Sequence, residues 1–250
     1  MRYSGSKKRF AKYLLPIITE HLTEDTYFID AFMGGANILS EVSQTNKKFG
    51  IEINRYVHSL WVELRVHGME RIPKEVSEEM YYDVKQSYIN QDNRYPYYII
   101  GYVGTCCSYG GAWFNGYARF NPNKNEDHIK EAYNGLKKQV ENFKHFKETY
   151  FYNNTYEIIN TIKFPKGTVI YCDPPYANTK KYESDFDHVY FWDWVRHMSQ
   201  NGFYVYVSEY EAPDDFKCIW QMNKKDGMSA TKKGQKQQNK IEKLFVYNGN

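Results

Sequence analysis

Two hydrophobic patterns alternate along most of the chain. Apolar residues at 3- and 4-residue spacing predict amphipathic helices, and short apolar runs bounded by turn residues predict buried strands. The helices are expected at residues 6–22, 36–43, 55–67 and 189–199. The strands are expected at residues 26–30, 48–52, 150–153, 168–172, 203–208, 218–222 and 244–247. This order predicts an α/β fold with a doubly wound, Rossmann-like sheet that is mostly parallel and has an antiparallel edge strand.

The alternation breaks between residues 73 and 147. A helix is expected at 75–89, followed by an aromatic and glycine-rich stretch at 95–120. A second helix carries apolar residues on one face at 4-3-4-3 spacing, namely Ile129, Tyr133, Leu136, Val140 and Phe143. We therefore expect residues 71–147 to form an inserted domain. Residues 1–70 and 148–250 would together form the domain that contains the sheet.

Composition narrows the class of protein. At 250 residues the chain has the length of one large domain, or of one domain with an insertion. Its 33 basic and 30 acidic residues allow an anionic partner wherever the positive charge is clustered. The four cysteines form no C-x-x-C pair and the seven histidines no H-E-x-x-H, so we expect neither a metal site nor a disulfide scaffold. We also expect no membrane contact and a cytoplasmic location, because no apolar run approaches the ~18 residues that span a bilayer.

The strongest chemical signal is Asp173-Pro174-Pro175-Tyr176, directly after the strand at 168–172. Ligands bind at the carboxyl ends of strands in open α/β sheets. The two prolines fix φ and contribute no N–H, which makes this turn rigid. The Asp173 carboxylate and the Pro174 carbonyl could accept the two N–H groups of an exocyclic amine while the Tyr176 ring stacks on the base. The alternative is a proline-rich strand-to-helix turn in which the aspartate caps a helix.

A glycine turn and an acidic residue indicate a second binding function. Gly34 and Gly35 let the main chain approach a ligand closely. The chain lacks a complete G-x-G-x-x-G motif, which favours a cofactor without a pyrophosphate. Glu52 ends a strand about twenty residues further on, where an acid commonly holds ribose hydroxyls, although a solvated carboxylate is the alternative. Together with Asp30 and Asp173, Glu52 would attract a cationic ligand.

Taken together, these motifs resemble those of a known family. Residues 173–176 resemble the catalytic motif of amino-methyltransferases, and nearly the whole chain resembles the Dam-type (D12 class) N6-adenine DNA methyltransferases in a form common in phages. Residues 2–7, 28–36, 52–54, 107–119 and 153–156 carry the rest of the resemblance. It implies that the sheet domain binds S-adenosylmethionine and that the inserted domain recognises the target in double-stranded DNA.

The resemblance also implies roles for individual residues. The catalytic residues would be Asp173, Pro174, Pro175 and Tyr176. The cofactor-binding residues would be Tyr3, Lys7, Asp30, Phe32, Gly34, Gly35, Glu52, Ile53, Asn154, Thr155 and Asp173. Three residues depart from the family pattern: Ala31 replaces a proline, Ala36 the last glycine of the turn, and Thr155 an acid that lies near the cofactor adenine.

The expected reaction is direct methyl transfer to N6 of an adenine rotated out of the duplex. Accepting both N–H groups would free the nitrogen lone pair, so that orientation and electrostatics supply most of the acceleration. Cytosine N4 is an alternative acceptor, and a catalytically inactive DNA-binding protein of the same fold is a further alternative. A cytosine C5 mechanism is disfavoured because Cys172, at the end of a strand, is expected to be a buried apolar residue.

DNA contacts are expected from basic clusters and from the aromatic segment. The candidates are Lys8, Arg9, Ser108, Tyr109, Trp113, Asn115, Tyr117, Arg119, Lys232 and Lys233. The alternatives are an aromatic core that closes the insertion and, for the lysine-rich run near the C-terminus, a solvated loop. Tyr182, Asp185 and His188 would shape the mouth of the pocket. We expect a monomer, with a dimer on DNA left open.

Overall fold

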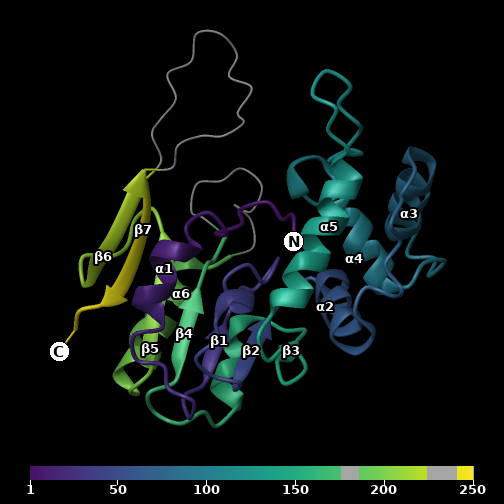
Figure 1. Cartoon of the computed structure of the whole chain (residues 1–250). Helices are drawn as coiled ribbons and strands as arrows, with labels where there is room; N and C mark the ends of the chain where they lie inside the picture. The colour runs from purple at the N-terminus through teal and green to yellow at the C-terminus, as the bar shows by residue number, and fades with distance from the viewer. Residues whose placement is uncertain (176–185, 224–240, 250) are drawn as a thin grey trace, which may run out of the picture.

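The computed structural model describes residues 1–175, 186–223 and 241–249, and within these ranges it contains one sheet of seven strands (Figure 1). The strands are β1 (Phe28–Asp30), β2 (Lys48–Ile51), β3 (Tyr150–Tyr152), β4 (Val169–Cys172), β5 (Tyr204–Glu209), β6 (Phe216–Asn223) and β7 (Ile241–Tyr247). Their spatial order is β3-β2-β1-β4-β5-β7-β6. The first five strands pair in parallel, whereas β7 is antiparallel to both β5 and the edge strand β6. The expected mostly parallel α/β sheet is confirmed, and its one reversed strand is β7, which lies second from the edge.

Helices cover both faces of the sheet. They are α1 (Ala11–Ile18), α2 (Arg55–His67), α3 (Glu78–Asn90), α4 (Tyr97–Cys106), α5 (His128–Asn142) and α6 (His188–Gln200), with short 3₁₀ helices η1 (Leu39–Glu41), η2 (Tyr109–Gly111) and η3 (Tyr156–Thr161). Alternate residues of a strand point to opposite faces. Val169 and Tyr171 accordingly join the core shared with α1, α2 and the helices of 71–147. Ile170 and Cys172 join the core beneath α6 and η3.

Three helices between α2 and β3 form a block beside the β3 end of the sheet (Figure 1). We call α3, α4, η2 and α5 the helical block. The expected helices at 55–67, 75–89 and 189–199 are present as α2, α3 and α6. The pattern missed α4, because its glycines and its apolar residues on every side hide the amphipathic period. Eight of its ten residues are buried.

The helix expected at 36–43 is wrong. The chain there makes a series of turns and the three-residue η1. Gly34 has φ +44° and Ala36 has φ +48°, so the backbone is left-handed where a helix would have to begin.

The helix expected at 6–22 is also shorter than the pattern predicted, since α1 covers only residues 11–18. Within the part of the chain that the structure describes, no helix is both long and apolar enough to cross a bilayer.

Two helical glycines provide a matched test of packing. A Cβ on Gly101 of α4 would lie 2.2 Å from the Tyr56 carbonyl oxygen of α2, whereas a Cβ on Gly135 of α5 would meet nothing within 4 Å. We expect Gly101→Ala to lower the free energy of unfolding by about 2–3 kcal/mol, because the two helices must move apart. We expect Gly135→Ala to raise it by about 0.5–1 kcal/mol through helix propensity. Urea unfolding of both variants measures this, and equal effects would contradict the packing argument.

Candidate active site

Three carboxylates lie at the carboxyl ends of neighbouring parallel strands. Asp30 is the last residue of β1, Glu52 follows β2, and Asp173 follows β4. β1 lies between β2 and β4 in the sheet. The chain winds from β1 through β2 to β3 on one side and from β4 to β5 on the other, so this is the point where strand order reverses. Open α/β sheets bind their ligands at such a point.

Asp30 and Glu52 are buried, which makes the charged forms of their carboxyl groups unfavourable. Asp30 is 2% exposed, and its Oδ1 has no hydrogen-bond partner among the described residues. Burial, followed by the nearby Asp173 charge, raises the pKa of Asp30 to about 8. Burial also raises the pKa of Glu52 to about 7, although the Asn54 amide donates to its Oε1 at 2.7 Å. Neither carboxyl group forms an ion pair with any residue in the described ranges. A cationic ligand with hydroxyl donors would therefore be stabilised here.

Tyr3 covers the glycine turn between β1 and η1. A Cβ on Gly34 would lie 2.6 Å from Cε1 of Tyr3, and a Cβ on Gly35 would lie 2.7 Å from Cβ of Tyr3. The structure thus shows a specific reason for both glycines, which is the close approach of the Tyr3 side chain. The Trp61 indole N–H of α2 also donates to the Gly34 carbonyl oxygen at 3.0 Å, which ties the turn to α2.

The helical block reaches this turn through a residue that the sequence analysis did not single out. Gln139 of α5 is buried, and its Nε2 lies 3.0 Å from the Gly35 carbonyl oxygen, 3.1 Å from that of Ala36 and 3.0 Å from Ser40 Oγ. The signal was present in the sequence, because Gln139 is the one amide on the otherwise apolar face of this helix. Gln139 fixes the Ala36 backbone in its left-handed conformation from the side of the helical block.

A buried lysine joins the catalytic turn to the last strand of the chain. Lys7 Nζ lies 2.5 Å from Asp173 Oδ1 and 3.4 Å from Glu242 Oε1. Lys7 is 4% exposed and Glu242 is fully buried. Burial acts to lower the pKa of Lys7, but the charges of Asp173 and Glu242 outweigh it and raise that pKa above its usual value. Sequence reasoning missed Glu242, although it is an acid two residues before buried Leu244 on the same face of β7.

The structure describes part of the predicted catalytic turn and part of the predicted pocket mouth. Pro174 is buried and Pro175 half-buried, directly after β4. Tyr176, Tyr182 and Asp185 lie outside the described residues. Cys172 is fully buried, and burial raises the pKa of its thiol well above the usual range. This agrees with its interpretation as an apolar interior residue.

Residues after β2 and β3 meet beside Glu52. The Asn153 side-chain amide donates to the carbonyl oxygens of Glu52 at 2.8 Å and of Ile53 at 3.0 Å. This places the exposed Asn154, and Thr155 after it, next to the Glu52 segment. The Ile53 side chain is 71% exposed there.

Phe32 and His188 lie near η3 and the start of α6. The Phe32 ring packs 5.4 Å from Tyr156 and 5.8 Å from Phe191 (centroid distances), so it is half-buried against η3 and α6. His188 is the first residue of α6 and contacts Phe186 at 4.9 Å. Burial lowers the pKa of His188.

Several of the predicted DNA-binding residues are accessible. Lys8 and Arg9 are exposed immediately before α1. Asn115 is exposed, Tyr109 is 58% exposed, and the Arg119 side chain is 70% exposed. Arg119 forms a two-pronged ion pair with Glu78 in the first turn of α3, with Nε at 3.1 Å from Oε2.

Other residues of the aromatic segment serve the interior of the helical block. Ser108 is fully buried, and its Oγ lies 2.9 Å from both Tyr81 Oη and the Gly104 carbonyl oxygen. The Trp113 ring packs against Tyr56 and Tyr88, and Tyr117 donates its hydroxyl to the Val76 carbonyl at 2.6 Å. The expectation that Ser108 presents its hydroxyl to base edges is therefore corrected. Lys232 and Lys233 lie outside the described residues.

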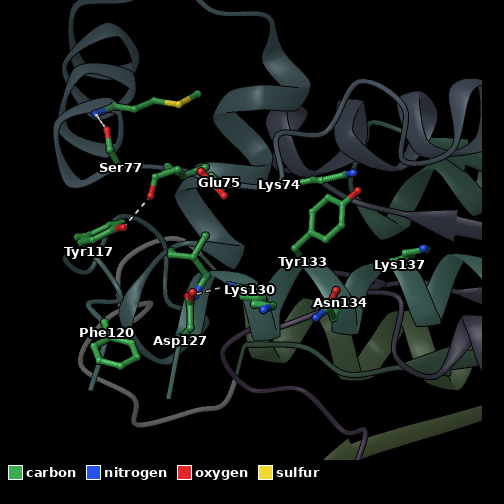
Figure 2. A pocket seen from close by; sticks show the side chains of 13 residues that line it. Lys74, Glu75, Ser77, Tyr117, Phe120, Asp127, Lys130, Tyr133, Asn134 and Lys137 are labelled. Atoms are coloured by element: carbon green, nitrogen blue, oxygen red, sulfur yellow. Dashed lines mark hydrogen bonds between the residues drawn. The ribbon is translucent and has the colours of Figure 1, made fainter. Parts of the chain in front are cut away.

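The helical block contains a groove of about 960 Å³ that the sequence analysis did not predict (Figure 2). In Figure 2, Lys74, Tyr133 and Lys137 lie toward one end and Phe120 and Asp127 toward the other. The groove is lined by Lys74, Glu75, Val76, Ser77, Met80, Tyr117, Phe120, Asp127, Ile129, Lys130, Tyr133, Asn134 and Lys137. Its three lysines are exposed, and two acids, Glu75 and Asp127, line the groove with them.

Among the described residues, no group of three or more histidine, cysteine or acidic side chains could hold a metal ion.

Residues 3–241 match the family model described as D12 class N6 adenine-specific DNA methyltransferase. The chain is 26% identical over 238 residues to the Type II methyltransferase M.FokI of Planomicrobium okeanokoites, covering 83% of this chain and 35% of that one. It therefore spans about a third of that relative's length. It also aligns with the crystal structure of a candidate methylase, HI0767 of Haemophilus influenzae, at a TM-score of 0.35 and 10% identity, covering 96% of this chain and 98% of that one.

Proposed function

This chain belongs to the D12 class N6 adenine-specific DNA methyltransferases, and from that premise we propose that it transfers the methyl group of S-adenosylmethionine to N6 of an adenine rotated out of duplex DNA. The observation that carries the proposal is the position of Asp30, Glu52 and Asp173 at the carboxyl ends of β1, β2 and β4, where the strand order of the sheet reverses. The site combines acceptors for an amine with a negative environment for a cation.

The described residues fit the cofactor. S-adenosylmethionine would supply the methyl group from a positively charged sulfonium. Asp30, whose buried Oδ1 lacks a partner among the described residues, and Glu52 would supply the negative charge that such a ligand requires. Glu52 would also accept ribose hydroxyls. Phe32, two residues after Asp30, and the exposed Ile53, directly after Glu52, offer apolar surface to the ligand.

Asp173 and the Pro174 carbonyl oxygen would hold the target amine. Each accepts one N–H of N6, which frees the nitrogen lone pair for the methyl carbon. As the N–C bond forms the S–C bond breaks, and the positive charge passes to N6. Asp173 would take the proton that N6 then loses. Tyr176 would stack on the extruded base, by resemblance to the family.

The DNA would contact two regions. Residues 71–147 would form the target-recognition domain, and residues 1–70 with 148–250 the catalytic and cofactor-binding domain. The exposed Arg119 and Asn115 would read base edges, whereas Lys8, Arg9 and the lysines of the groove in Figure 2 would contact phosphates.

The two kinds of DNA contact lead to different expectations. We expect Arg119→Ala to reduce the ratio of cognate to scrambled duplex binding by about tenfold, because a good contact to a base edge is worth 1–3 kcal/mol. We expect Lys130→Ala to weaken both duplexes about equally and to reduce the salt slope, because a phosphate contact carries no sequence information. Fluorescence anisotropy over a salt series measures both effects. Equal losses on the two duplexes for Arg119→Ala would contradict its role.

A methyl-transfer assay tests the function itself. The protein is incubated with tritium-labelled S-adenosylmethionine and DNA from a strain without adenine methylation, and the nucleosides are analysed by mass spectrometry. N6-methyladenine is the expected product. N4-methylcytosine would contradict the assigned substrate, and absence of any labelled nucleoside would indicate a binding protein without turnover.

A further inference from the structure

The contact between Lys7 and Asp173 conflicts with the role proposed for Asp173. A carboxylate that accepts a charged N–H bond at 2.5 Å is a weaker acceptor for a second donor. Lys7 also carries a positive charge beside the place where N6 becomes positive. At 2.5 Å from Asp173 Oδ1, this charge would oppose the charge that develops during methyl transfer.

Glu242 offers Lys7 a second position. Its Oε1 lies 3.4 Å from Lys7 Nζ, so a shift of less than about 1 Å brings the ammonium group to hydrogen-bond distance. Glu242 is fully buried, and a buried carboxylate is favourable only beside a cation. Lys7 itself is only 4% exposed, which keeps water from competing for its charge.

The sheet topology holds Glu242 in this place. Glu242 is the second residue of β7 and pairs with Met222 of β6, while the next residue, Lys243, pairs with Glu209 of β5. Leu244 lies on the same face of β7 as Glu242 and belongs to the core that also contains residues of α1. Lys7 precedes α1 and reaches the carboxyl ends of the strands from that face.

From this geometry we infer that Glu242 is a positioning residue: it shares the Lys7 ammonium with Asp173 and shortens its own contact to that ammonium when the target amine arrives. In the free protein Lys7 is ion-paired with Asp173 and orients its carboxylate. In the complex Asp173 accepts the amine while Lys7 and Glu242 remain paired. The inference rests on the proposed function, because it concerns the step in which the amine binds.

The test compares Glu242→Gln with the wild type and with Glu24→Gln, the same change at an exposed residue before β1, at the opposite end of the sheet. Methyl transfer is followed under single-turnover conditions on DNA that lacks adenine methylation, and the cofactor Kd is measured by calorimetry. We expect Glu242→Gln to lower the transfer rate about tenfold and to change Kd by less than about threefold. Glu24→Gln should change neither quantity.

Two further variants separate charge from shape. Glu242→Asp keeps the charge and is expected to retain about a third of the wild-type rate. In a Lys7→Met background, Glu242→Gln is expected to change the rate by less than about twofold, because Glu242 acts through Lys7. A full tenfold loss in that background, or an aspartate variant as slow as the amide variant, would overturn the inference.

If Glu242→Gln does not fold, the Glu242→Asp variant decides. A transfer rate about threefold below the wild type with an unchanged cofactor Kd supports the inference, and an unchanged rate overturns it.

Failure of the inference and failure of the proposed function give different results. A wild-type protein that transfers no methyl group contradicts the proposed function. A wild-type rate that is matched by Glu242→Gln overturns only the role of Glu242.

Discussion

Asp173→Ala is expected to lower the rate of methyl transfer by at least about 10³-fold while the protein stays folded. The change removes one of the two acceptors for the target amine and the group placed to take its proton. The fold should survive because Asp173 lies in a turn after β4 with 20% of its side chain exposed, and because Glu242 still balances the charge of buried Lys7. Single-turnover transfer and thermal melting measure the two effects.

The control for this prediction removes an acid elsewhere. Asp214→Ala changes an exposed aspartate in the loop before β6 and should leave the rate within about twofold of the wild type. Asp173→Asn adds a second comparison, since the amide keeps the shape but not the charge of the acceptor. Turnover by Asp173→Ala at a tenth of the wild-type rate or more would disprove the assigned mechanism.

Glu52→Gln is expected to weaken cofactor binding about 30-fold at pH 8, because it removes a buried charge near the sulfonium and an acceptor for ribose. The amide oxygen can still accept the Asn54 N–H, which now bonds to Glu52 at 2.7 Å, so the loop should keep its conformation. Calorimetry with S-adenosylmethionine measures the change. Glu70→Gln, at an exposed position after α2, is the matched control and should bind as the wild type does.

The pH dependence of cofactor binding provides a second readout of the same residue. The pKa values of Asp30 and Glu52 are raised to about 8 and about 7, so both carboxyl groups must lose a proton to hold a cation well. The affinity of the wild type should therefore rise by at least about tenfold between pH 6 and pH 8. The rise should be smaller in Glu52→Gln, because only Asp30 still titrates. A pH-independent affinity in the wild type would contradict the role of both carboxylates.

The same pKa shift predicts the opposite effect on the stability of the ligand-free protein. Because the folded state raises the pKa of Glu52, the unfolded chain loses this proton at lower pH. The free energy of unfolding consequently falls as pH rises from about 4.5 to about 7. Glu52→Gln removes this loss and should stabilise the ligand-free protein at pH 8 by roughly 1–3 kcal/mol. A variant with lower stability at that pH would show that Glu52 supports the fold.

The local pattern of the sequence was sufficient for the sheet and for the positions of its acids. Short apolar runs located the seven strands of the described residues, most clearly β4, whose four residues are all buried and form a continuous apolar segment. The predicted α2 and the observed Arg55–His67 coincide, since Asn54 caps its start and Gly68 follows its end. Asp30, Glu52 and Asp173 could be named in advance because each ends or follows a predicted strand.

Only the tertiary structure decided which side chains meet. Glu242 lies next to Lys7 because β7 is inserted antiparallel beside β5, a pairing that no local pattern specifies. Gln139 reaches the glycine turn from a helix about a hundred residues away in the sequence. Ser108 turns inward because it follows α4, which places it against Tyr81. The sequence pattern did not reveal α4, because nearly all of its residues are buried. Local sequence governs backbone conformation and burial pattern, whereas contacts between distant segments depend on packing of the whole chain.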